Sequence, residues 1–200
     1  MKKALIVVDV QNDFLPGGSL AVANGDQVIP VANLLIDSHL FETIVFTQDW
    51  HPSDHNSFKS NSKEGIWPNH CVQGTFGAEF ADMLNSPLVT NNSFVVQKGT
   101  NPLVDSYSGF FDNDKKGQTG LDYFLREKGI EELFVLGLAT DYCVKFTVLD
   151  ALMFGYEVTL VLDGCRAANI SPDDENKAIV EMLKAGANVI ASGQIVTSHY

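Results

Sequence analysis

The sequence predicts an α/β fold, in which a mainly parallel sheet carries helices on both faces. Short apolar runs alternate along the chain with segments of helical periodicity, an order typical of parallel sheets. The runs at residues 5–8 and 133–138 are almost continuously apolar, as expected for strands buried on both faces. With 200 residues, no internal repeat and no linker, the chain is expected to form one domain over residues 1–200.

The remaining elements follow from the same patterns. Strands are predicted at 5–8, 43–47, 94–97, 133–138, 156–162 and 188–191. Helices are predicted over 28–40, 121–128, about 141–152 and 172–184. Ser171 is the expected N-cap of the last helix, and Gly186 follows its end. Residues 12–24, 50–92 and 99–120 are predicted loops, and an excursion as long as 50–92 is usually functional.

The charge balance and the cysteines narrow the class of protein. Acidic residues outnumber basic ones by 25 to 13, and the net charge of -12 argues against a nucleic-acid partner. Asp9 and Asp13 interrupt the first apolar run, so we expect neither a signal peptide nor membrane attachment. Three cysteines without framework spacing indicate a reducing, cytoplasmic compartment.

The segment GLATDYCV places Cys143 where a predicted strand passes into a predicted helix. The unpaired N–H groups and the positive dipole end of a helix gather in its first turn. Such a position is expected to lower the pKa of a thiol and to offer backbone donors to an oxyanion. The alternative is that Cys143 is a small buried apolar residue.

Two further strand ends carry charged residues that suit a cysteine nucleophile. Asp9 follows the first predicted strand, and Lys98 follows the third. Ligands of open parallel sheets bind outside the carboxyl ends of the strands, where these side chains and Cys143 can meet. There the carboxylate would accept the thiol proton, and the ammonium would hold the carboxylate and favour the thiolate. Taken singly, Asp9 can be a polar strand terminus and Lys98 a solvated loop residue.

A second group of polar residues follows the second predicted strand. Asp49 and His51 are two residues apart on an extended segment, and His70 follows in the sequence IWPNHC. One carboxylate with two imidazoles suits a single divalent ion such as Zn²⁺, Fe²⁺ or Mn²⁺. His55 lies between them and is a further candidate ligand. The alternative is a set of loop histidines with ordinary polar roles. We expect Cys71 and Cys165 to be buried and without a ligand role.

These motifs together resemble those of bacterial nicotinamidases, within the isochorismatase-like cysteine hydrolase superfamily. The resemblance extends over nearly the whole chain. The segments that carry it are VVDVQNDFLPGGSL, FTQDWHPSDHNSF, WPNHCVQGTFGAEF, QKGTNPLVDSYSGFFDN and GLATDYCVKFTVLDAL.

The resemblance implies a six-stranded parallel sheet and hydrolysis of nicotinamide to nicotinate and ammonia. It implies Asp9, Lys98 and Cys143 as the catalytic triad. As metal ligands it implies Asp49, His51 and His70, with His55 either ligating directly or standing behind the ligands. It also implies a cis peptide bond before Ala139, with the N–H groups of Ala139 and Cys143 forming the oxyanion hole.

Aromatic residues near these motifs are candidates to line the pocket for the pyridine ring. They are Phe14, Trp67 and Tyr107, although Phe14 can equally pack in the core. The main alternative function is that of a metal-independent isochorismatase-like or N-carbamoyl amide hydrolase on the same scaffold. A binding protein without activity and a structural metal protein with an inert Cys143 are further alternatives. The sequence leaves open whether the chain is a homo-oligomer, and how it ranks nicotinamide against pyrazinamide.

Overall fold

The computed structural model describes residues 1–85 and 93–197, and its centre is a six-stranded sheet in the order β3-β2-β1-β4-β5-β6. Every pair of neighbouring strands is parallel, so the predicted α/β class is confirmed. The strands are β1 (Lys2–Val8), β2 (Thr43–Asp49), β3 (Ser93–Lys98), β4 (Ile130–Leu138), β5 (Glu157–Arg166) and β6 (Asn188–Ile190).

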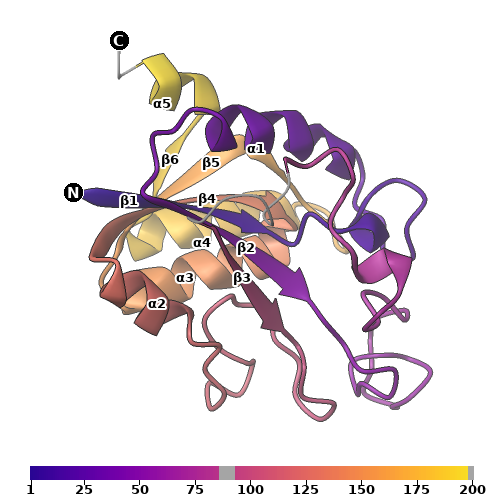
Figure 1. Ribbon diagram of the computed structural model, residues 1–200. Coiled ribbons are helices and arrows are strands. Elements are labelled where there is room, and N and C mark those ends of the chain that lie inside the picture. Colours follow the sequence, from indigo (N-terminus) through magenta and orange to yellow (C-terminus); the bar gives the residue numbers. More distant parts are fainter. Residues whose placement is uncertain (86–92, 198–200) are drawn as a thin grey trace.

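Helices cover both faces of this sheet (Figure 1). On one face lie α1 (Val28–Ile36) and α5 (Ser192–Thr197), and on the other lie α2 (Leu121–Glu127), α3 (Lys145–Met153) and α4 (Asp174–Ala185). Because the sheet is covered twice, its central strands are apolar along their length; Ala4 to Val8 of β1 are at most 1% exposed. Within the described residues, no helix has the length and apolar character needed to cross a bilayer.

The strand order determines where a site can form. The chain begins in the middle of the sheet and builds outward to β3 on one side and to β6 on the other. The carboxyl ends of β3, β2, β1 and β4 are therefore neighbours along one edge, where ligands of doubly wound sheets bind. The long loops after β2 and β3 gather at this edge (Figure 1).

Two predicted helix boundaries are wrong for local reasons. The first helix ends at Ile36 rather than at residue 40, because the Ser38 hydroxyl donates to the Leu35 carbonyl (2.6 Å) and His39 turns left-handed at φ 56°. Ser171 is not the N-cap of α4. That helix begins at Asp174, whose carboxylate instead accepts the Ser171 N–H. Gly186 ends it in the left-handed conformation, as predicted.

Two other elements depend on contacts that are distant in sequence. The predicted fifth strand stops at residue 162, but β5 continues to Arg166, because a register shift between β4 and β5, with the extra residues in β5, lets Gly137 pair with Cys165. The sequence does not predict the short helix α5. Its first N–H group, at Ser192, is bound by the Asp163 carboxylate of β5 at 2.8 Å.

The segment after β2 is irregular, as predicted, up to residue 85; the rest of the predicted loop, 86–92, lies outside the described residues. Within the described part of this loop, residues 50–85, there is one short 3₁₀ helix, Phe76–Ala78. Short bridges join His51 to Val72 and Phe58 to Trp67, which fold the segment back on itself. A bridge from Gln11 to Phe80, and a hydrogen bond from Gln11 Nε2 to the Ala78 carbonyl oxygen (2.8 Å), hold the loop against the carboxyl edge of the sheet.

Gly137 allows β4 to lie close to β1 just before the site. Its φ is +125°, and a Cβ atom there would lie 2.1 Å from the Val8 carbonyl oxygen. The three nearest atoms are all backbone atoms of Val8, in a buried strand that cannot move aside without displacing Asp9 as well. A side chain at this position therefore conflicts with the sheet itself.

We predict that Gly137→Ala lowers the free energy of unfolding by about 1–3 kcal/mol more than Gly155→Ala does. Gly155 is the matched control because it too has a positive φ, +86°, but a Cβ atom there would have no other atom within 4 Å. Urea denaturation of both variants measures the difference. Equal losses would show that the close approach to Val8 does not constrain the fold.

Candidate active site

Four neighbouring strands each bring one polar side chain to the same place. Lys98 is the last residue of β3, and Asp49 is the last residue of β2. Asp9 directly follows β1, and Cys143 lies in the turn after β4. All four are buried, between 0% and 6% exposed. The structure therefore brings together residues that are up to 134 positions apart, counted from Asp9 to Cys143.

The Lys98 ammonium is at the centre of this group. Its Nζ lies 2.8 Å from Asp9 Oδ2 and also pairs with Asp49 Oδ1. It donates to the Ser106 carbonyl oxygen at 3.0 Å and lies 3.4 Å from Cys143 Sγ. One buried cation thus contacts two buried carboxylates and a thiol.

Asp9 is held so that one carboxylate oxygen stays available. Its Oδ1 accepts the Thr47 hydroxyl at 2.6 Å, and its N–H donates to the Thr47 carbonyl. The backbone is left-handed at φ 48°, which turns the side chain out of the strand direction. Within the described residues, Oδ2 accepts no hydrogen bond of normal geometry beyond its ion pair with Lys98. A carboxylate oxygen of Asp9 lies within 4.8 Å of Cys143 Sγ.

Burial and charge set opposite protonation tendencies within the group. Burial raises the pKa of the Cys143 thiol well above its ordinary value, and the Lys98 ammonium offsets only part of that. Burial also raises the pKa of Asp9, although Lys98 opposes the change. Despite its burial, Asp49 has a pKa well below the ordinary value because of Lys98. Despite its own burial, Lys98 has a raised pKa because of Asp49 and Asp9.

The local setting of Cys143 differs from the prediction. The turn Thr140–Val144 is a π-helix, and the α-helix Lys145–Met153 begins only after it. Turns of this kind occur frequently at functional sites. The expected lowering of the thiol pKa is wrong, since burial outweighs the favourable charge of Lys98. The peptide bond between Leu138 and Ala139 is cis, as the resemblance implied.

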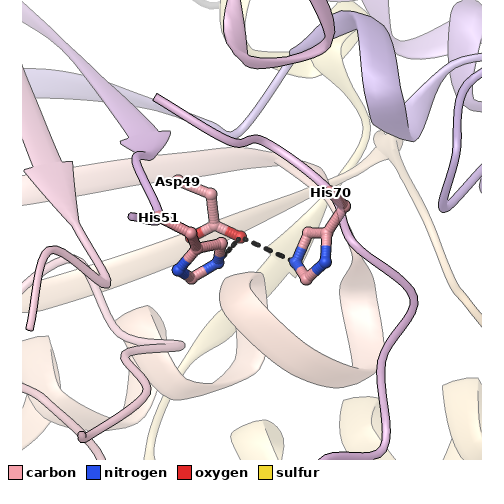
Figure 2. A group of neighbouring side chains, drawn as sticks. All are labelled: Asp49, His51 and His70. Carbon is pink, nitrogen blue, oxygen red and sulfur yellow. Dashed lines mark ion pairs between the residues drawn. The ribbon is translucent and has the colours of Figure 1, made fainter. Parts of the chain in front are cut away.

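A second cluster shares Asp49 with the first (Figure 2). Its Oδ2 lies 3.5 Å from His51 Nε2 and 3.8 Å from His70 Nε2, and both rings turn these nitrogens toward the carboxylate. The ligand atoms of the three residues lie within 4.8 Å of one another. One oxygen of Asp49 thus faces Lys98, while the other faces the imidazoles.

The hydrogen bonds of the two rings suit a metal ion. His51 Nδ1 lies 3.0 Å from the Gly99 carbonyl oxygen, and His70 Nδ1 lies 2.8 Å from that of Pro68. A carbonyl oxygen only accepts, so each Nδ1 carries a proton, and in the neutral form of each ring the lone pair is on Nε2. Metal-binding histidines are oriented in this way. A carboxylate with two imidazole nitrogens suits a divalent transition metal.

His55 stands beside this cluster. Its ring centroid is 4.3 Å from that of His51, and its ligand atom groups with those of His51 and Asp105. Its Nδ1 lies 2.7 Å from the Ser57 hydroxyl. The buried Nε2 has no hydrogen-bond partner among the described residues. The Ser57 N–H donates to His55 Nδ1 at 3.2 Å, so in this neutral tautomer the hydrogen is on Nε2, and coordination of a cation by Nε2 would require the other tautomer.

Two side chains that sequence reasoning missed hold the segments that carry Asp49 and His70 in place. Gln11 donates to the Asp49 carbonyl and accepts its N–H, each at 2.8 Å. Asp13 accepts the N–H of Cys71, the residue after His70, at 2.7 Å. They lie two and four residues beyond Asp9, inside the segment VVDVQNDFLPGGSL that carries the family resemblance, which is the signal that could have identified them.

The two clusters open into one cavity. The predicted aromatic residues Phe14, Trp67 and Tyr107 line it, together with Ala139 and Cys143. Trp67 Nε1 donates to the Tyr107 hydroxyl at 3.1 Å, which joins two loops across the cavity wall. Sequence reasoning assigned no role to several other lining residues, some of which lie inside the quoted motif segments: Leu20, Ala21, Val22, Asp105, Tyr142, Ala168 and Ile170.

Comparison with known proteins identifies the family. The isochorismatase domain model matches residues 3–194. The nicotinamidase of Escherichia coli (strain K12) is 48% identical over an alignment of 202 positions that covers 94% of this chain and 93% of the relative. The chain belongs to the nicotinamidases of the isochorismatase domain family.

Solved structures of nicotinamidase relatives agree with this fold over nearly all of the chain. PnC1 from L. infantum, in complex with nicotinate, has 36% identity and a TM-score of 0.89, and the match covers 96% of this chain and 93% of that one. The pyrazinamidase of Pyrococcus horikoshii, in complex with zinc, has 40% identity and a TM-score of 0.83, with coverages of 96% and 99%.

We predict that His51→Ala lowers the affinity for a divalent metal by at least about 10–100-fold, the loss typical even of residues that only support ligands. Elemental analysis and calorimetric titration with Zn²⁺ measure the effect. The control is His39→Asn, which changes an exposed histidine with a left-handed backbone that asparagine tolerates. Unchanged metal affinity in His51→Ala would contradict a metal site at this cluster.

Proposed function

We propose that this chain hydrolyses the amide bond of nicotinamide and releases nicotinate and ammonia. The observation that carries the proposal is the position of Asp49. Its two oxygens face Lys98, beside Cys143, on one side and the imidazoles of His51 and His70 on the other. A nucleophile and a cation site therefore share one cavity, which suits a substrate with a reactive carbonyl and a separate metal-binding atom.

Nicotinamide has those two features. Asp49, His51 and His70 would hold one divalent cation, with His55 as a further ligand or as a support for the others. The bound cation would supply a ligand position for the pyridine nitrogen and so orient the ring. Phe14, Trp67 and Tyr107 line the cavity and offer aromatic contacts to the ring. The donor set is compatible with Zn²⁺, Fe²⁺ and Mn²⁺ alike.

The first half of the reaction forms a thioester. Asp9 Oδ2 accepts the proton of Cys143 Sγ, and the sulfur attacks the carboxamide carbon. The raised pKa of Asp9 makes this transfer easier, because it brings the acid and the thiol closer in basicity. The Lys98 ammonium stabilises the negative charge as this charge moves from the Asp9 carboxylate oxygen to the Cys143 sulfur. The C–N bond then breaks, and the Asp9 carboxyl returns its proton to the departing nitrogen, which leaves as ammonia.

The second half of the reaction restores the enzyme. Asp9, again ionised, accepts a proton from water as the water oxygen attacks the thioester carbon. The C–S bond breaks and the sulfur takes this proton back; the second water proton stays on the new carboxyl group and passes to solvent, and the product leaves as nicotinate. In both halves the oxyanion would be held by the backbone N–H groups of Ala139 and Cys143, two residues that line the cavity. Loss of one such donor typically costs about 10²–10³ in rate.

We also propose that the protein works in a reducing, cytoplasmic setting. The nucleophile must be a free thiol, and Cys71, Cys143 and Cys165 are all unpaired and buried. Burial raises the pKa of Cys165 to about 12, which fits the expectation that it is inert. The pKa of the Cys71 thiol is raised well above its ordinary value, again by burial.

The main alternative is a metal-independent hydrolase of isochorismate-like or N-carbamoyl compounds. Such a reaction gives no role to His51 and His70, whose ring nitrogens converge on Asp49. The deciding experiment measures ammonia release from nicotinamide, pyrazinamide and N-carbamoylsarcosine, with metal analysis of the same protein. Turnover of the two ring amides that is lost with chelator supports the proposal. Preference for the carbamoyl compound, or turnover without metal, would overturn it.

We predict that Cys143→Ala lowers kcat for nicotinamide by more than about 10³-fold, since the covalent route is lost. Nicotinate should still bind the variant within severalfold of the wild-type Kd, because the ring contacts remain. Calorimetry and an ammonia assay measure the two effects. Cys165→Ala is the control, since it removes a buried thiol outside the cavity. Substantial activity in Cys143→Ala would rule out the thioester.

We predict that Asp9→Asn lowers kcat by about 10²–10⁴-fold, the usual contribution of a general base. The amide keeps the shape of the side chain but accepts the thiol proton poorly. Stopped-flow measurement of ammonia release, with nicotinate binding as the folding check, tests this role. A variant that keeps near wild-type kcat would assign the proton to another group.

A further inference from the structure

Asp141 is a buried carboxylate for which the reaction has no use. It lies two residues before Cys143 in the π-helical turn and is 5% exposed. Its Oδ1 accepts the N–H of Ala168 at 2.9 Å, and its Oδ2 accepts the N–H of Asn169 at 2.8 Å. Both oxygens are thus used to bind the backbone of a loop 27 and 28 residues further along the chain.

The loop that Asp141 binds forms part of the cavity wall. It follows β5, and both Ala168 and Ile170 line the cavity that also contains Cys143. The Ile170 side chain is 62% exposed, so packing in the core does not hold it in place. The backbone at Asn169 is left-handed at φ 48°, a conformation that asparagine adopts more readily than most other non-glycine residues.

A second connection closes this arrangement into a ring of hydrogen bonds. Asn169 Oδ1 accepts the N–H of Glu175 at 3.0 Å, at the start of α4. Glu175 Oε1 in turn accepts the hydroxyl of Thr140 at 3.4 Å, next to Asp141 in the π-helical turn. Asn169 is therefore linked to the turn that carries the nucleophile by two routes, one through Asp141 and one through Glu175 and Thr140.

We propose that Asp141 is a positioning residue that fixes the Ala168–Ile170 wall of the substrate cavity and thereby determines how tightly the pyridine ring is held. The proposal rests on the proposed function, because the ring is its ligand. Hydrogen bonds from N–H groups to an ionised carboxylate are stronger than neutral ones, so two of them suffice to hold an exposed loop. The wall lies on a different segment from Asp9 and Lys98, so its loss should weaken binding more than chemistry.

The test compares Asp141→Asn with wild type. An amide offers one acceptor oxygen instead of two and turns an NH₂ group toward a backbone N–H. We expect KM for nicotinamide and Kd for nicotinate to rise about tenfold, while kcat changes less than threefold. Exchange of the 168–169 amide hydrogens, followed by mass spectrometry, should become faster. Asp163→Asn is the control, because its carboxylate also binds a distant N–H, that of Ser192 at 2.8 Å, away from the cavity.

A second variant distinguishes an effect on the Ala168–Ile170 wall from an effect on the π-helical turn. Ile170→Ala changes an exposed side chain and is expected to fold normally, with a severalfold rise in KM. In the double variant the two effects should not add, because Ile170 contributes nothing once the loop has moved. Alkylation of Cys143 by iodoacetamide should proceed at the wild-type rate in Asp141→Asn.

Three results would overturn the proposal. One is faster exchange in Asp141→Asn with unchanged KM and Kd, which would make the loop irrelevant to binding. Another is a fall in kcat and in the rate of Cys143 alkylation with unchanged KM, which would show that Asp141 positions the Cys143 nucleophile rather than the cavity wall. The last is that the effects of Asp141→Asn and Ile170→Ala on KM add fully in the double variant. Absence of ammonia release by the wild-type protein would instead refute the proposed function, and the exchange experiment would still measure whether Asp141 holds the loop.

Discussion

The site depends on a single buried cation, the ammonium of Lys98. Without it, Asp9 and Asp49 would place two negative charges in a region with almost no solvent, and an unpaired buried charge costs several kcal/mol. Lys98 pairs with both and also lies 3.4 Å from the Cys143 sulfur. Its raised pKa shows that the two carboxylates outweigh its own burial. Lys98 therefore links the stability of this edge of the sheet to its chemistry.

The parallel sheet explains how such an arrangement can form. Strand order places β3, β2, β1 and β4 side by side, and each contributes one polar side chain at or just beyond its carboxyl end. The apolar interiors of these strands fix their register. The polar residues at their ends therefore meet, although they are far apart in the sequence. Close approach of β1 and β4 at Gly137 brings Asp9 near the turn that carries Cys143. The fold thus supplies a rigid base, and the loops complete the cavity.

Much of this could be predicted from the sequence, because strand ends in a parallel sheet share one edge. Asp9, Lys98 and Asp49 were identifiable as charged residues that end apolar runs. The Ala168–Ile170 wall of the cavity could not be predicted, because Ala168 and Ile170 have no reactive or charged group that marks them in the sequence. The Asp141 hydrogen bonds, which join distant segments, place them at the cavity. The protonation of Cys143 was also mispredicted, since burial depends on packing that local sequence does not show. The same applies to α5, whose cap comes from Asp163 in β5.

The most direct test of the role of Lys98 is a double-mutant cycle for unfolding with Lys98→Met and Asp9→Asn. Removing one member of a buried ion pair typically costs about 3–5 kcal/mol, mostly because its partner is left charged and unpaired. If Lys98 compensates the buried carboxylates, Lys98→Met should be strongly destabilised in urea. Adding Asp9→Asn should then restore a substantial part of the loss. Losses that simply add in the double variant would contradict the central place given to this cation.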